Sequence, residues 1–160
     1  MTETIVTSND TAAAPTTPWH LWVVGILSLL WNGFGGYDYV MSQTRNMEYL
    51  GGMAPSPEAA RELVAMLEAF PAWMEFFWAL GVWGAIAGSV LLLMRNRFAV
   101  HAFAVSLLGM VVGMVYQMTM TNAPEWTTEG ALAIFPWVIM LIGVLLLAYA
   151  ISMRRKGWLR

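Results

Sequence analysis

The chain contains 160 residues, of which 59% are hydrophobic and only 11% are charged, and its mean hydropathy is +0.60. A soluble domain carries about twice this share of charged residues, so we expect one integral membrane domain. The net charge of −2 and the lack of a basic stripe argue against a nucleic-acid partner, and the absence of cysteine excludes disulfides, thiolate metal sites and a cysteine nucleophile.

The chain begins with a polar segment, residues 1–18, that lacks the basic start and apolar centre of a signal peptide. We expect a disordered tail that stays in the cytoplasm. A first membrane span is predicted over residues 19–41, because about 20 residues of helix cross a hydrocarbon core of about 30 Å. The outer third of this span, residues 31–39, is rich in glycine and polar side chains, so we expect it to be bent or partly unwound.

The segment between residues 42 and 71 is too polar to be membrane core. Within it, Ser56-Pro57-Glu58 has the cap, the first-turn proline and the early acid of a helix start. Apolar residues then recur at helical spacing, opposite the charged ones. We therefore predict a short amphipathic helix over residues 57–69 that lies on the membrane surface.

Three further apolar runs follow, and each is long enough to cross a membrane. A tight basic turn at residues 95–97 joins the first two, which must therefore be antiparallel neighbours. A polar loop at residues 121–130 precedes the last run, and the chain closes on a basic tail, residues 154–160. The expected fold is an all-α, four-helix transmembrane bundle. Its spans cover residues 19–41, 72–94, 98–120 and 131–153, which form one domain over residues 19–153.

Charged residues are distributed unequally between the two ends of this predicted bundle. Six of the eight lysines and arginines fall on the side shared by both termini, whereas eight of the ten acids fall on the other side. The positive-inside rule therefore places both termini in the cytoplasm and the amphipathic helix on the periplasmic side. The six cations are Arg95, Arg97, Arg154, Arg155, Lys156 and Arg160.

Small residues recur at four-residue spacing in the second and third spans. Helices in lipid associate through close packing, so such stripes mark helix–helix contacts. We expect the second span to pack on the third, and a homodimer contact or a seam for a partner subunit is the alternative. The residues concerned are Gly81, Gly84, Ala85, Gly88 and Ser89 in the second span, and Ala102, Ser106, Gly109 and Gly113 in the third.

Polar side chains gather toward the outer ends of the predicted spans. Such groups are costly inside a membrane and tend to face the bundle or a wet cavity, so this cluster is the candidate ligand site. The alternative is structural: Asn32 forms an interhelical hydrogen bond, while Asp38 and Glu75 reach water at the headgroups. The cluster comprises Asn32, Tyr37, Asp38, Glu75, Tyr116 and Gln117.

We expect no metal, no cofactor and no catalysis. His20 and His101 stand at the membrane interface, where imidazole usually meets water and headgroups; a haem or metal ligated by these two histidines is the alternative. The stripe of methionines in the third span is typical of gap-filling packing. The sequence contains no nucleophile elbow, zinc-protease helix, phosphate loop or dinucleotide fingerprint. An acid–base pair of Asp38 and Glu75 is the one enzymatic alternative, and nothing else in the sequence supports it.

Two stretches of the sequence are distinctive: WHLWVVG at residues 19–25 with WNGFGGYDYVMSQTRN at 31–46, and FPAW at 70–73 with LGVWG at 80–84. They resemble a family of short alphaproteobacterial membrane proteins that commonly carry the label "sugar transporter" or "hypothetical membrane protein". The resemblance extends over nearly all of the chain after the tail. It implies four spans in a bacterial inner membrane.

The transport label implies a sugar site, in which rings stack on aromatic side chains and hydroxyls bind amides and carboxylates. Four helices are too few to enclose an alternating-access pathway, so a transporter would need at least two copies of the chain. The side chains that offer such groups are Trp31, Asn32, Tyr37, Trp78, Tyr116 and Gln117.

Two functions follow from these observations. The first, which we expect, is an accessory or scaffold subunit of a larger inner-membrane assembly, with lipid and other membrane subunits as its partners. It fits the small-residue faces, the uncharged span centres and the lack of a catalytic motif. The alternative is a homo-oligomeric transporter or binding protein for a small polar solute, such as a sugar, that uses the outer polar cluster.

Overall fold

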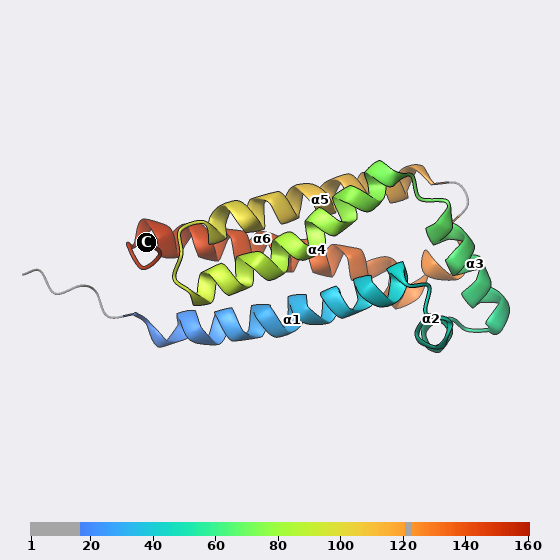
Figure 1. The fold of residues 1–160 in the computed structure, drawn as a ribbon, viewed down its shortest axis with the longest axis horizontal. Coiled ribbons are helices and arrows are strands. Elements are labelled where there is room, and N and C mark those ends of the chain that lie inside the picture. Colours follow the sequence, from blue (N-terminus) through green and yellow to red (C-terminus); the bar gives the residue numbers. More distant parts are fainter. Residues whose placement is uncertain (1–16, 121–122) are drawn as a thin grey trace, which may run out of the picture.

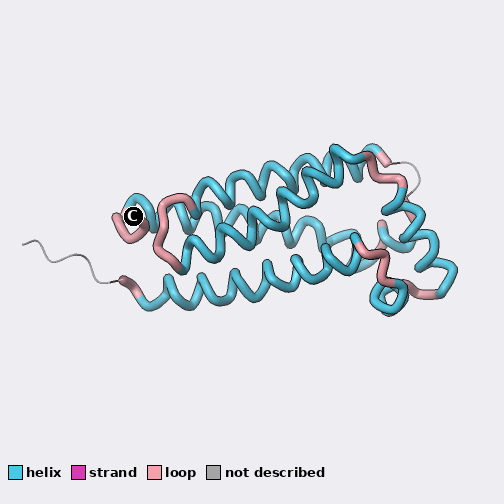
Figure 2. Tube along the Cα trace, viewed as in Figure 1, coloured by secondary structure: helices cyan, strands magenta, loops and turns pink. Residues whose placement is uncertain are grey.

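The computed structural model describes residues 17–120 and 123–160, and the regular structure of these residues is entirely helical. The all-α class is therefore confirmed. Four long helices form an elongated bundle, and three short elements complete the described part (Figure 1, Figure 2). The long helices are α1 (Trp19–Gln43), α4 (Ala72–Leu93), α5 (Ala99–Thr119) and α6 (Gly130–Arg155), and the short elements are α2 (Met47–Met53), α3 (Pro57–Glu68) and the 3-10 turn η1 (Glu125–Thr127).

The long helices pack in the order α1, α4, α5, α6, and the contact between α4 and α5 is the most extensive. α1 packs along α4 and α6 packs along α5, and side chains of α1 also meet α6, at His20–Tyr149 and Trp31–Phe135. The start of α1, the turn between α4 and α5 and the end of α6 lie at one end (Figure 1). We call it the basic end, after the six cations of residues 95–97 and 154–160, and we call the opposite end, with α2 and α3, the acidic end.

Three helices are long and apolar enough to cross a membrane: α4, α5 and Leu132–Arg155 of α6. α1 is long enough but less apolar, because Asn32, Asp38 and several glycines interrupt its apolar sequence. The structure therefore supports a membrane protein with three candidate spans. The predicted first span, residues 19–41, would add a fourth to these three and stays a prediction.

α1 is one uninterrupted helix as far as Gln43, so the expected partial unwinding over residues 31–39 is wrong, whereas the expected bend stays a prediction. A glycine costs a helix only about 1 kcal/mol relative to alanine, and packing against α4 outweighs that cost. A Cβ atom at Gly36 would lie 2.7 Å from Ile86 Cδ1, and one at Gly25 would lie 2.5 Å from Leu93 Cδ2. These two glycines therefore allow α1 to approach α4 closely.

The amphipathic α3 forms close to the predicted residues, whereas α2 was not predicted. Both helices begin with a side-chain cap: Oδ1 of Asn46 accepts from the Tyr49 N–H at 2.9 Å, and Oγ of Ser56 accepts from the Ala59 N–H at 3.1 Å. A buried Leu50 fixes α2 against its neighbours. With only seven residues, α2 shows too little periodicity to be recognised in the sequence.

Two residues after the last residue of α1 and of α4, the chain contains an arginine in the left-handed region. These are Arg45 at φ 52° and Arg95 at φ 57°. After each, the N–H of the next residue, Asn46 or Asn96, bonds back to a carbonyl of the last helical turn at 3.0 or 2.8 Å. This is the pattern of a Schellman motif, in which glycine usually holds the left-handed position. An arginine there costs about 1–2 kcal/mol of backbone strain, so contacts of its side chain must offset that cost.

α4 and α5 meet at backbone distance. A Cβ atom at Gly109 would lie 2.5 Å from the Phe77 carbonyl oxygen and 2.6 Å from the Gly81 nitrogen. Ser106, which is 1% exposed, donates its hydroxyl to the Gly81 carbonyl across the same contact. The predicted packing of these two spans is therefore what the structure contains. Gly81, Ala85, Gly88, Ser89, Ser106, Gly109 and Gly113 are buried, and Gly84 and Ala102 are half-buried.

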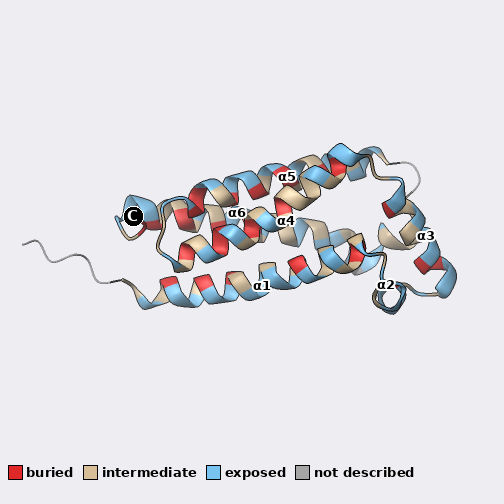
Figure 3. Cartoon of the chain, viewed as in Figure 1, coloured by how far each residue is buried: buried red, intermediate tan, exposed pale blue. Residues whose placement is uncertain are grey.

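Buried residues lie where the helices face one another, and the outer surface of the bundle is largely exposed (Figure 3). This outer surface is apolar, with large hydrophobic side chains along α1 and α6. In the apolar window of α6, only 11% is buried within the chain. An apolar surface of this extent is compatible with lipid or with a partner subunit.

We predict that alanine has opposite effects at two glycines of the long helices. Gly109→Ala should lower the free energy of unfolding by about 1–3 kcal/mol, because its Cβ meets the backbone of α4. Gly33→Ala should raise it by about 0.5–1 kcal/mol, because nothing lies within 4 Å of its Cβ. Unfolding in mixed micelles, followed by circular dichroism, measures both changes. Equal losses in the two variants would contradict this description of the α4–α5 contact.

Candidate functional site

Asn32 joins α1 to α4 near the middle of the bundle. Its Nδ2 donates to Ser89 Oγ at 2.9 Å and to the Ala85 carbonyl at 3.4 Å. Ser89, which is 0% exposed, donates its own hydroxyl to the same carbonyl at 2.9 Å. Interhelical hydrogen bonds in membrane proteins contribute about 0.6 kcal/mol on average and up to about 1.7 kcal/mol. Asn32 therefore makes the interhelical hydrogen bond that the structural alternative expects.

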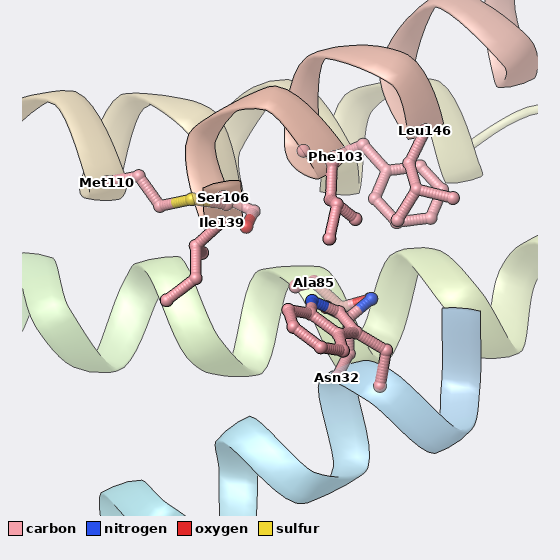
Figure 4. Close-up of a pocket in the computed structure, with 10 residues that line it drawn as sticks. Asn32, Ala85, Phe103, Ser106, Met110, Ile139 and Leu146 are labelled. Carbon is pink, nitrogen blue, oxygen red and sulfur yellow. The ribbon is translucent and has the colours of Figure 1, made fainter. Parts of the chain in front are cut away.

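A small cavity lies beside Asn32, between α1, α4, α5 and α6 (Figure 4). Its volume of about 10 Å³ is room for roughly one water molecule. Apart from Asn32 and Ser106 its lining is apolar, and it includes Trp31. A pocket for a small organic ligand usually has about 300–1,000 Å³. A sugar therefore does not fit into this cavity.

At the acidic end, Arg45 connects three segments of the chain. Its guanidinium donates to the carbonyl of Ser42, at the end of α1, and to the carbonyl of Leu67, in the last turn of α3, at 3.2 Å. The same group lies 3.8 Å from the Glu75 carboxylate in the first turn of α4. These contacts offset the backbone strain of Arg45 in the left-handed region, and they attach α3 to α1 and α4.

Asp38 forms a hydrogen bond with the short helix α2. The Tyr49 hydroxyl donates to Asp38 Oδ1 at 2.8 Å, and the ring of Tyr37 lies perpendicular to the Tyr49 ring at 5.4 Å. Burial raises the pKa of Tyr49, and the hydrogen bond and negative charge of Asp38 raise it further, from 10.0 to about 12. The phenol therefore stays protonated at neutral pH and holds α2 against α1.

The aromatic side chains of the acidic end form a continuous edge-to-face series. Tyr39 of α1 contacts Trp78 of α4 at 5.0 Å, and Trp78 contacts Phe70 at 6.1 Å. Phe70 in turn contacts Tyr116 of α5 at 5.7 Å, and Tyr116 contacts Trp73 at 5.2 Å. Pairs of this geometry contribute about 0.5–1.5 kcal/mol each beyond their buried area. Trp78 and Tyr116 are therefore packed against neighbouring rings, with no open site between them.

The structure divides the predicted outer cluster into separate groups that share no cavity. Asn32 and Trp31 line the small cavity, Tyr37 and Asp38 meet α2, and Glu75 meets Arg45. Trp78 and Tyr116 belong to the aromatic series, and Gln117 is exposed. The ligand-site hypothesis for these residues stays a prediction.

Sequence reasoning missed two residues that organise the acidic end, Arg45 and Tyr49. A signal for Arg45 was present, because it is one of only two cations on a side that holds eight acids. Tyr49 gave no such signal, since its partner Asp38 is eleven residues away and α2 was not predicted.

At the basic end, His20 Nδ1 lies 2.6 Å from the Tyr149 hydroxyl of α6, so His20 meets a side chain rather than only water and headgroups. His101 is exposed beside Phe98. Within residues 17–120 and 123–160, no group of three histidine, aspartate or glutamate side chains is placed to hold a metal ion.

Comparisons with protein-family models, with curated proteins and with solved structures give no match for this chain. The resemblance to short alphaproteobacterial membrane proteins therefore stays a prediction. The contacts described above are the basis for any assignment of function.

We predict that Arg45→Gly loosens α3 while the long helices stay folded. Glycine removes the backbone strain but also the bonds to two carbonyls and the contact with Glu75. Hydrogen bonds from a charged group contribute about 1.5–3 kcal/mol, and solvent screening reduces this because Glu75 is 39% exposed. Amide exchange in α3 should accelerate roughly five- to tenfold. Arg61→Gln, which breaks an exposed pair within α3, is the control and should change exchange less than twofold.

A second prediction concerns the pH dependence of α2. The pKa of Tyr49 is higher in the folded chain than in the unfolded one, so its contact with Asp38 stabilises the fold fully below pH 10 and loses this effect as the pH rises toward 12. Asp38→Asn should lower the pKa of Tyr49 only in part, because burial is the larger cause. A spectrophotometric tyrosine titration, with Tyr49→Phe to assign the step, measures this. An unchanged Tyr49 step in Asp38→Asn would refute the hydrogen bond.

Proposed function

We propose that this chain is a four-span protein of a bacterial inner membrane, with both termini in the cytoplasm, that acts without catalysis as an accessory subunit of a larger membrane assembly. The proposal has three parts: the fourth span, the orientation and the contact site for a partner. Each has its own support in the contacts of the described residues.

The length and exposure of α1 support its role as the fourth span. Its 25 residues extend about 37 Å at 1.5 Å per residue, which is enough to cross a hydrocarbon core of about 30 Å. α1 packs along α4, which is itself a candidate span, so the two helices share one depth range. Its outward side is apolar, and its central amide, Asn32, bonds to α4.

The positions of the charges support the proposed orientation. Six of the eight cations belong to the basic end, where α1 begins and α6 ends (Figure 1). The positive-inside rule assigns such an end to the cytoplasm. α2 and α3, with their acids, then lie on the periplasmic side.

One observation carries the proposal of a partner subunit: two glycines inside α1 have no neighbour. In the interior of the four long helices, the other glycines of the described chain each approach a side chain or backbone of another helix. Gly33 and Gly35 have nothing within 4 Å of a Cβ atom. In membranes, small residues are enriched where helix backbones approach one another. Gly33 therefore marks a place on α1 where a helix of another chain can pack, whereas Gly35, about 200° further around the helix, faces a different direction.

The side chains around Gly33 suit such a contact. Ile26 and Leu30 precede Gly33 at helical spacing and Tyr37 follows it, and the three side chains are 51%, 67% and 50% exposed. Together these four residues form an outward apolar face of α1, which we call the Gly33 face. Large side chains on both sides of a glycine leave a depression into which a partner's side chains can interlock.

The acidic end favours a structural role over solute transport. Asp38 and Glu75 are already engaged with Tyr49 and Arg45, and the aromatic rings contact one another. The cavity beside Asn32 has room for roughly one water molecule. A wider, open hollow of about 380 Å³ between α2 and α3 is lined by none of the predicted site residues. These contacts support the accessory subunit over the alternative of an oligomeric transporter or binding protein for a small polar solute.

Purification in a mild detergent tests the proposal. The chain should recover a membrane protein at fixed stoichiometry, and Gly33→Leu should reduce that recovery at least about tenfold. The melting temperature of the isolated Gly33→Leu chain should not fall, because the new side chain meets nothing within the chain. Ala148→Leu, at an exposed position of α6, is the matched control and should leave recovery unchanged. A monodisperse homo-oligomer alone, or equal recovery with Gly33→Leu, would overturn the proposal.

A further inference from the structure

The last described residues of the chain return along the turn between α4 and α5. Residues 158–160, which we call the strap, form two backbone hydrogen bonds with this turn. Arg160 N–H donates to the Arg95 carbonyl at 2.8 Å, and Arg97 N–H donates to the Arg160 carbonyl at 2.9 Å. Leu159, the residue before Arg160 in the strap, is only 4% exposed and belongs to the same core cluster as Leu92.

The end of α6 is built to direct the strap to this position. Gly157 adopts φ 75°, which reverses the chain, and the Trp158 N–H bonds back to the Met153 carbonyl at 3.1 Å. Arg95 adds a side-chain contact, since its Nε donates to the Trp158 carbonyl at 3.4 Å. The strap therefore holds the basic residues from two distant segments of the sequence on one surface.

The cations on this surface have no carboxylate partner among the residues that the structure describes. Both ion pairs of those residues, Arg45–Glu75 and Arg61–Glu58, lie at the acidic end. Residues 1–16 carry two acids, Glu3 and Asp10. Even if each of these acids paired with one of the six cations, four cationic side chains would remain. The six are Arg95, Arg97, Arg154, Arg155, Lys156 and Arg160.

Large apolar side chains are exposed at the same end of the bundle as these cations. They are Trp19, Met94 and Phe98, which are 75%, 68% and 53% exposed. The Arg97 guanidinium lies 5.5 Å from the centre of the Phe98 ring, and the Lys156 ammonium lies 5.1 Å from the centre of the Trp158 ring. Cations beside aromatic rings are typical of the level at which lipid headgroups meet acyl chains. Here the Phe98 ring is exposed and the Trp158 ring is half-buried.

We propose that the strap and the α4–α5 turn together form a binding site for the headgroup of an anionic phospholipid. The phosphodiester oxygens accept hydrogen bonds from the arginine side chains, and the acyl chains pass along the exposed apolar residues beside them. The inference rests on the proposed membrane location. The apolar side chains around the cations favour a lipid over free phosphate, because inorganic phosphate has no contact to make with Trp19, Met94 or Phe98.

Native mass spectrometry of the purified full chain tests the site. The protein is incubated with equal amounts of phosphatidylglycerol and phosphatidylcholine in detergent, and the bound lipids are counted. We expect phosphatidylglycerol to be retained at least fivefold over phosphatidylcholine. Arg97→Gln should reduce this ratio roughly three- to fivefold, as expected for the loss of one cation near an anionic headgroup. Arg61→Gln removes the same charge at the acidic end and should leave the ratio unchanged.

Two variants that keep all six cations separate an assembled site from general charge attraction. Leu159→Ala removes the anchor of the strap, and Gly157→Ala strains the reversal before it. Each variant should lower the ratio of bound phosphatidylglycerol to bound phosphatidylcholine. In at least one of the two variants, the circular dichroism spectrum and the gel-filtration profile should match those of the wild type. An unchanged ratio in both would overturn the proposed site.

Three further results would also overturn it. These are no preference for phosphatidylglycerol in the wild type, an equal fall in Arg61→Gln, and displacement of the lipid by inorganic phosphate at millimolar concentration. Failure of this inference with intact recovery of a partner would leave the proposed function standing. Loss of partner recovery with intact lipid selectivity would overturn the proposed function and leave the lipid site standing.

Discussion

The backbone contact between Gly81 of α4 and Gly109 of α5 is the constraint on which the rest of the bundle depends. Lipid tails are as apolar as leucine, so helices in a membrane gain little from the hydrophobic effect and associate through close packing. Here the packing reaches backbone distance, and the hydroxyl of Ser106 bonds to the Gly81 carbonyl across it. The separation of α4 and α5 then determines where α1 packs on α4 and where α6 packs on α5.

The acidic and basic ends of the bundle use their charges differently. At the acidic end, Arg45 and Tyr49 engage Glu75 and Asp38 and attach the short helices to the long ones. At the basic end, backbone hydrogen bonds and the buried Leu159 provide the attachment, and the cations remain without carboxylate partners in the described residues. At the acidic end, charged side chains therefore help to attach the helices to one another. At the basic end, the cations face the surroundings of the protein.

Much of the fold was predictable, because apolar runs of sufficient length and local caps such as Ser56 are visible in the sequence. Sequence gives the depth of a residue along a helix more readily than the direction of its side chain. Asp38 and Glu75 were therefore placed at similar depth, but they meet different partners. The continuous helix through the glycines of α1 was missed for a related reason: Gly36 is favoured by its contact with Ile86, a residue of another helix.

The connection between α4 and α5 has a consequence for the order in which the bundle assembles. The two helices are separated only by a tight turn around Arg95 and Arg97, so the entropy lost in bringing them together is small. α1 and α6 reach this hairpin through longer connections, and α1 packs on α4 while α6 packs on α5. The hairpin can therefore form first and serve as a template for these two helices. A helix that arrives late is also the element for which a helix of another chain can compete, before the bundle is complete.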